Sequence, residues 1–133
     1  MLDASVVLKW FHREGEANVD AARQLRKDFQ AGELRVIAPP LLWLEILNVA
    51  ARRWKWNFDQ LDQLDQLAAA LPELGFEEIE PELDGVAEWA AQGLTAYDAA
   101  YVATAEEAGI PLITDDAEIC RIAPEASEPL VES

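Results

Sequence analysis

The chain has 133 residues, of which 51% are hydrophobic, and a formal net charge of −16. This length is sufficient for one domain with a sizeable core, and no apolar run approaches the roughly 20 residues that span a membrane. The charge disfavours a broad basic surface for nucleic acid and favours cations or basic proteins as partners.

The chain contains one cysteine, Cys120, and one histidine, His12. A lone cysteine cannot form an internal disulfide, and the first residues lack the pattern of a signal peptide, so we expect a cytoplasmic protein. The same scarcity disfavours zinc fingers and catalysis by Cys-His or Ser-His-Asp groups.

Apolar spacing predicts that strands and helices alternate along the chain. Strands are expected at residues 1–2 (a stub), 34–38, 76–79, 110–114 and around Leu130-Val131. Helices are expected at residues 6–11, 18–30, 41–54, 58–71, 83–91 and 96–108, with a helical turn in the tail. This alternation predicts a parallel sheet covered on both faces, with right-handed crossovers. We see no linker and expect residues 1–133 to form a single domain.

Caps support several of these bounds. Pro39-Pro40 suits the start of a helix, and Asn57 suits the cap of the next one. Thr95 and Asp98 have the spacing of a capping box, and Gly109 suits a left-handed C-cap.

Four acidic residues fall at distinctive places: Asp3 after the first strand, Glu45 within an apolar helix, Asp98 at a helix start and Asp116 after a late strand. In open α/β sheets, sites lie at the carboxyl ends of strands. Carboxylates without His or Cys nearby favour Mg²⁺ or Mn²⁺ over zinc. Such an ion relieves the repulsion between crowded carboxylates and can supply hydroxide for attack on phosphorus.

Each acid also has a purely structural interpretation. Asp3, Asp98 and Asp116 are positioned to cap helices, and Asp115 is an ordinary turn residue. Glu45 is costly to bury without a partner, and a buried arginine is an alternative to a metal ion in that role. The conjunction of the four acids, rather than any one of them, indicates a metal site.

Four blocks of the sequence carry a family resemblance: residues 2–11, 38–49, 93–101 and 111–116. In this order they resemble PIN-domain ribonucleases, specifically the VapC toxins of prokaryotic toxin–antitoxin pairs. The block around Asp98, joined to the Thr114-x-Asp116 block, is the specific part of the match. The Asp3-x-Ser5 start alone is not specific.

The resemblance implies a three-layer α/β/α sandwich with a central parallel sheet (PIN-like), and a Mg²⁺- or Mn²⁺-dependent endoribonuclease that hydrolyses RNA phosphodiesters. The family's catalytic and metal-ligating acids match Asp3, Glu45, Asp98 and Asp116. Its supporting hydroxyls match Ser5, Thr95 and Thr114. As an alternative, the hydroxyls only cap helices and form turns.

The resemblance also implies partners. They are a basic VapB-like antitoxin protein, which would suit the charge of this chain, and a second copy in a homodimer, with no membrane. The basic residues Arg52, Arg53 and Lys55 beside two tryptophans either contact RNA or favour the helix dipole. Lys9 and Arg13 are alternative phosphate contacts.

The sequence departs from the family pattern in its short first strand, in its acidity and in Asp115, where the family has a small or uncharged residue. One rival hypothesis is a catalytically inactive PIN-like module that only binds protein. Another is phosphoryl transfer on a different α/β fold with Asp3 as nucleophile. That class needs a second acid two residues on, where this chain has Ser5.

Overall fold

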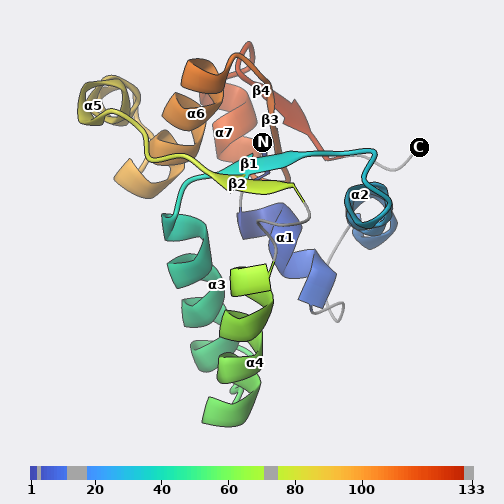
Figure 1. The fold of residues 1–133 in the computed structure, drawn as a ribbon. Coiled ribbons are helices and arrows are strands. Elements are labelled where there is room, and N and C mark those ends of the chain that lie inside the picture. Colours follow the sequence, from blue (N-terminus) through green and yellow to red (C-terminus); the bar gives the residue numbers. More distant parts are fainter. Residues whose placement is uncertain (3, 12–17, 71–74, 131–133) are drawn as a thin grey trace.

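The computed structural model describes residues 1–2, 4–11, 18–70 and 75–130 (Figure 1). The predictions for Asp3, His12, Arg13, Leu71 and Val131 lie outside these residues.

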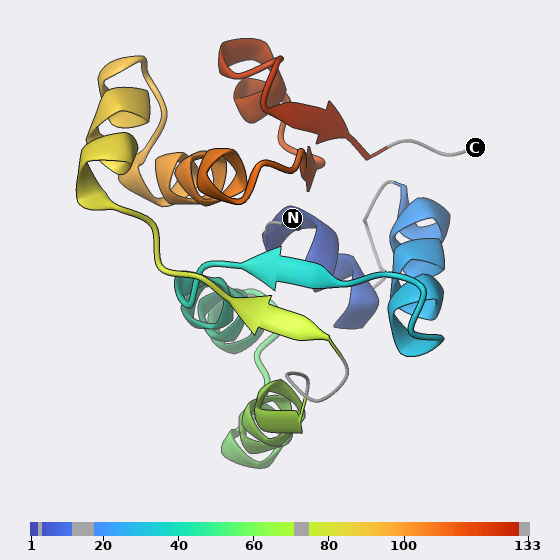
Figure 2. The same cartoon turned by 45° about the horizontal axis from the view of Figure 1, so that its top comes forward.

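Two pairs of short parallel strands form the centre of the molecule. β1 (Val36–Ala38) pairs with β2 (Phe76–Glu78), and β3 (Leu112–Thr114) pairs with β4 (Ser127–Pro129). The second residue of the chain joins the two pairs. Leu2 forms a parallel bridge to Ile113, and its N–H donates to the Ile37 carbonyl at 3.4 Å. Met1 accordingly lies between β1 and β3 in both views (Figures 1 and 2).

Helices lie on both sides of the strands (Figure 1). On one side are α1 (Ala4–Phe11), α3 (Leu41–Arg52) and α4 (Phe58–Ala70). On the other are α5 (Leu83–Ala91), α6 (Ala96–Ala108) and α7 (Ala117–Ile122). α2 (Val19–Gln30) packs beside α1 at the edge. This arrangement confirms the predicted α/β architecture with parallel strands.

The core is continuous from the first residues to the last strand. Leu2, Val6 and Val7 are buried beside Leu112, and α6 is buried from Ala99 to Ala105. Because five of these seven α6 residues are alanine or valine, the helix packs closely against α5 and β3.

Most predicted caps are found. The Asn57 side chain accepts from the Gln60 N–H at 3.0 Å, while Gln60 accepts from the Asn57 N–H at 2.9 Å. Gly109 ends α6 with φ of 69°, in the left-handed region that glycine tolerates. The sequence analysis placed the last strand too late in the chain, around Leu130-Val131, whereas β4 ends at Pro129. The Leu130 N–H extends the pairing by donating to the Thr114 carbonyl.

No helix within the described part of the chain is both long enough and apolar enough to span a membrane.

Candidate functional site

A cleft of about 500 Å³ lies between the middle of α3 and the start of α6. Its lining residues are Leu41, Leu44, Glu45, Asn48, Thr95, Tyr97 and Asp98. Two of the four predicted acids, Glu45 and Asp98, therefore face the same space although they are 53 positions apart in the sequence. The half-buried Glu45 comes from the apolar half of α3, and Asp98 comes from the first turn of α6.

Local capping fixes the position of Asp98. The Thr95 hydroxyl, at the N-cap of α6, accepts from the Asp98 N–H at 3.1 Å. Partial burial raises the pKa of the Asp98 carboxyl, and the negative charge of Asp116 raises it further, whereas a hydrogen bond with Thr95 lowers it. Asp98, at the start of α6, thus lies near enough to Asp116, after β3, for their charges to interact.

Asp116 caps α7 through one of its two carboxylate oxygens. Its Oδ1 accepts from the N–H groups of Glu118 at 2.9 Å and Ile119 at 3.3 Å, which caps α7. Both of these bonds use Oδ1, so the second carboxylate oxygen is left for a cation. The structural interpretation of Asp116 is therefore correct, and it does not exclude a role in a site.

Two of the predicted supporting hydroxyls hold the turn after β3. Ser5 Oγ, on α1, accepts from the Asp115 N–H at 2.9 Å and lies 3.4 Å from Thr114 Oγ1. Thr114 is fully buried, and its Oγ1 accepts from the Asp116 N–H at 3.0 Å. The two hydroxyls thus bond the backbone that carries Asp116, as groups that orient a ligand do.

The sequence analysis missed the role of Asp115. The Lys9 side chain is 2% exposed, and its Nζ lies 3.1 Å from Asp115 Oδ2. The Asn18 amide donates to the other oxygen, Oδ1, at 3.0 Å. Both oxygens of Asp115 therefore have protein partners, which leaves Asp116 as the acid of this pair that can bind a ligand.

This ion pair also corrects the interpretation of Lys9 as a phosphate contact, because the ammonium group is buried and paired. One signal was present in the sequence: Lys9 is a charged residue on an otherwise apolar helix, one turn after Ser5. A lysine in such a place needs a buried acid as its partner.

The acids fit a hard divalent cation by the chemistry of their donors. Glu45, Asp98 and Asp116 offer only carboxylate oxygens, which Mg²⁺ and Mn²⁺ prefer. Among the residues that the structure describes, no three His, Cys, Asp or Glu side chains are grouped closely enough to hold a metal ion. The predicted fourth acid, Asp3, lies outside those residues.

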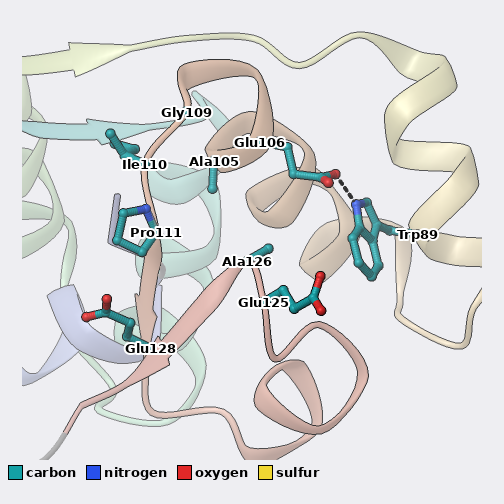
Figure 3. Close-up of a pocket in the computed structure, with 9 residues that line it drawn as sticks. All are labelled: Trp89, Ala105, Glu106, Gly109, Ile110, Pro111, Glu125, Ala126 and Glu128. Carbon is teal, nitrogen blue, oxygen red and sulfur yellow. Dashed lines mark hydrogen bonds between the residues drawn. The ribbon is translucent and has the colours of Figure 1, made fainter.

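A second hollow, of about 540 Å³, lies at the amino ends of β3 and β4, away from Asp116 at the carboxyl end of β3. Three glutamates, Glu106, Glu125 and Glu128, line it together with Trp89, whose indole N–H donates to Glu106 (Figure 3). The sequence analysis did not single out this region. It contains none of the predicted site residues.

Comparison with known proteins gives a family model and a structural match. The model described as PIN domain matches residues 1–124. The crystal structure of PAE2754 from Pyrobaculum aerophilum superimposes with a TM-score of 0.66 and 21% sequence identity, covering 97% of this chain and 87% of that chain. At this identity the likeness shows a shared fold, in agreement with the predicted PIN-like sandwich. No curated protein matches the chain.

Proposed function

Because the chain belongs to the PIN domain family, we propose that it is an endoribonuclease that hydrolyses RNA phosphodiesters with Mg²⁺ or Mn²⁺. PIN domains are generally metal-dependent nucleases, and they usually use divalent ions. The observation that carries the proposal is that Glu45 and Asp98 face one cleft, with the charge of Asp116 near enough to raise the pKa of Asp98.

The proposed ligands are Asp3, Asp98 and Asp116, with Glu45 either as a ligand or as the group that orients the attacking water. A divalent ion bound here would lower the pKa of a bound water and stabilise charge on the phosphate. Thr95, Ser5 and Thr114 hold the backbone and carboxylates in place through the bonds described above. Burial of Thr114 keeps solvent away from its bond with the Asp116 N–H and makes that bond stronger.

We further propose that the protein is the toxin of a VapBC-type pair. The resemblance of its four sequence blocks to VapC toxins supports this role. The net charge of −16 would attract a basic VapB-like antitoxin. A homodimer is proposed on the same resemblance, and it can be checked by the mass of the purified protein in solution.

The test is cleavage of a mixed pool of structured RNAs by the purified protein with Mg²⁺, with Mn²⁺ and with EDTA. We expect cleavage only with metal, and its loss in Asp98→Asn. The matched control is Glu106→Gln, which removes one negative charge from the second hollow and should cut like the wild type. Equal cleavage by the wild type and Asp98→Asn would place the activity elsewhere.

A binding measurement separates the rival module from the nuclease. Mg²⁺ that binds the folded state raises its melting temperature, and saturation at about 100 times the Kd adds about 2.7 kcal/mol to its stability. We expect this stabilisation in the wild type and its reduction in Asp98→Asn. A folded protein that neither binds Mg²⁺ nor cuts RNA would favour the catalytically inactive protein-binding module.

A further inference from the structure

The cleft has an apolar rim that metal binding does not explain. Tyr97, next to Asp98 on α6, is 66% exposed, and Leu44, next to Glu45 on α3, is 70% exposed. Both line the cleft together with the two acids. An exposed tyrosine ring offers a flat apolar face, on which a nucleobase can stack.

A cation lies beside the same cleft, next to one of its lining residues. Arg52 Nε donates to the side-chain oxygen of Asn48 at 3.0 Å, and Asn48 is a lining residue. Within the described ranges Arg52 takes part in no ion pair, although acidic residues outnumber basic ones by 26 to 10. Its remaining N–H groups are therefore available to an anion, and a guanidinium group matches the geometry of a phosphate.

The spacing along α3 aligns these groups. Residues 41, 45, 48 and 52 follow one another at intervals of four, three and four, so they share one face of the helix. With a rise of about 1.5 Å per residue, Arg52 lies roughly 10 Å from Glu45 along the axis. Arg52 contacts Asn48 from the side away from Glu45, so Arg52 would contact a phosphate next to the one at the acids.

We propose that Tyr97 and Arg52 bind the RNA strand at two points, with Tyr97 in the cleft stacking on a base beside the cleaved phosphodiester and Arg52, beside the cleft, holding a phosphate further along. This inference rests on the proposed function. A base within a duplex is already stacked on its neighbours, so only an unpaired base can reach Tyr97.

The stacking contact is tested with an RNA hairpin whose loop contains the cut site. Tyr97→Ala should lower kcat/KM by about 5- to 150-fold, the range expected for one lost stacking contact, and Tyr97→Phe should restore it. The wild type should cleave an RNA that lacks the base next to the cleavage site more slowly by the same factor. On that abasic RNA, Tyr97→Ala should cause no further loss.

The matched control is Phe58→Ala, which removes an aromatic residue that is 78% exposed on α4 and does not line the cleft. It should cut like the wild type. The proposal is overturned if Tyr97→Ala cuts the intact hairpin normally, which would assign the rim to a protein partner. It is also overturned if the full loss persists on the abasic RNA.

The phosphate contact is tested by binding, which needs no turnover. In the Asp98→Asn background with Mg²⁺, the affinity for a fluorescein-labelled single-stranded RNA is measured against salt concentration. Arg52→Met should reduce the slope of log K against log salt by about 0.7, whereas Arg53→Met, at the adjacent exposed position, should not. Equal slopes for the two variants, or no binding at all, would contradict the proposal. Salt-dependent binding without cleavage by the wild type would contradict the nuclease function and leave only the Arg52 contact with RNA standing.

Discussion

Acidic side chains lie near both ends of β3, but they are held in different ways. At the carboxyl end, Asp98 is half-buried, and burial and the charge of Asp116 raise its pKa. At the amino end, Glu106, Glu125 and Glu128 are exposed to solvent. The fold thus holds Asp98 partly out of water near a second negative charge, whereas the three glutamates extend into solvent.

The comparison shows that the number of acids is a poor guide to a site. Glutamates at the surface separate and are screened by water, so they need no further explanation. Carboxylates that the fold forces together against their mutual repulsion are typical of functional sites. The three predictions below test this difference, beginning with the largest expected effect.

Lys9→Met should have the largest effect on stability. It leaves the Asp115 carboxylate without its buried counter-ion, and breaking such a pair typically costs about 3–5 kcal/mol of unfolding free energy. Glu106→Ala, which removes the bond from Trp89 in the second hollow, should cost only about 1 kcal/mol. Urea denaturation of both variants measures the difference.

A second substitution tests whether the lost charge pair is the cause. Lys9→Met combined with Asp115→Ala removes both charges, and it should recover part of the stability that Lys9→Met loses. Equal destabilisation by Lys9→Met and Glu106→Ala would mean that the two ends of β3 do not differ as described.

Glu45→Gln should abolish most of the activity with little change in stability. The substitution keeps the shape of the side chain but removes one negative charge from the cleft. We expect kcat to fall by at least about 100-fold. Changing a residue that only supports a metal ligand typically costs up to about 100-fold, and a ligand itself should matter at least as much. Glu106→Gln removes the same charge at the amino end and serves as the control. Similar rates for these two variants would remove the functional distinction between the hollows.

The smallest expected effect is a pH dependence of stability. Because the folded-state pKa of Asp98 is raised, the folded protein holds this proton to a higher pH than the unfolded chain does. The contribution of Asp98 to stability therefore falls as pH rises from about 3.9 through the raised pKa, and it stays lower above it. In EDTA at pH 7, Asp98→Asn should be slightly more stable than the wild type, and this difference should disappear in acid.

Magnesium provides the control for this prediction. An ion that binds the carboxylates favours their charged form, so Mg²⁺ should make the wild type the more stable of the two proteins at pH 7. Thermal unfolding across pH, with EDTA and with Mg²⁺, measures both effects. Identical curves for the two proteins in EDTA would show that Asp98 is under no electrostatic strain.

The sequence predicted helices and strands well where local rules decide them. The bounds of α5 were predicted as found, and the caps of α4 and α6 were identified from Asn57 and Thr95. The last strand was placed too late because Pro129 was taken as a barrier. At the edge of a sheet a proline is tolerated, since it needs no partner for an N–H group.

The arrangement of the site was predictable only in part. Glu45, Asp98 and Asp116 were chosen because of their places in the chain, and their role in binding metal stays a prediction. The partner of Lys9 could not be read from the sequence, because the ion pair joins residues more than 100 positions apart. The proximity of Tyr97 to the apolar side of α3 likewise depends on how two helices meet.

The bonds around Asp115 bear on when a nascent chain becomes active. They join α1 and Asn18 to the end of β3 across 97 to 110 positions of sequence, so they cannot form until that strand has been synthesised. Contacts of such long range also form slowly during folding. A chain still being translated therefore lacks the turn that carries Asp116, so under the proposed function a ribosome making this nuclease is not exposed to it before most of the polypeptide has emerged.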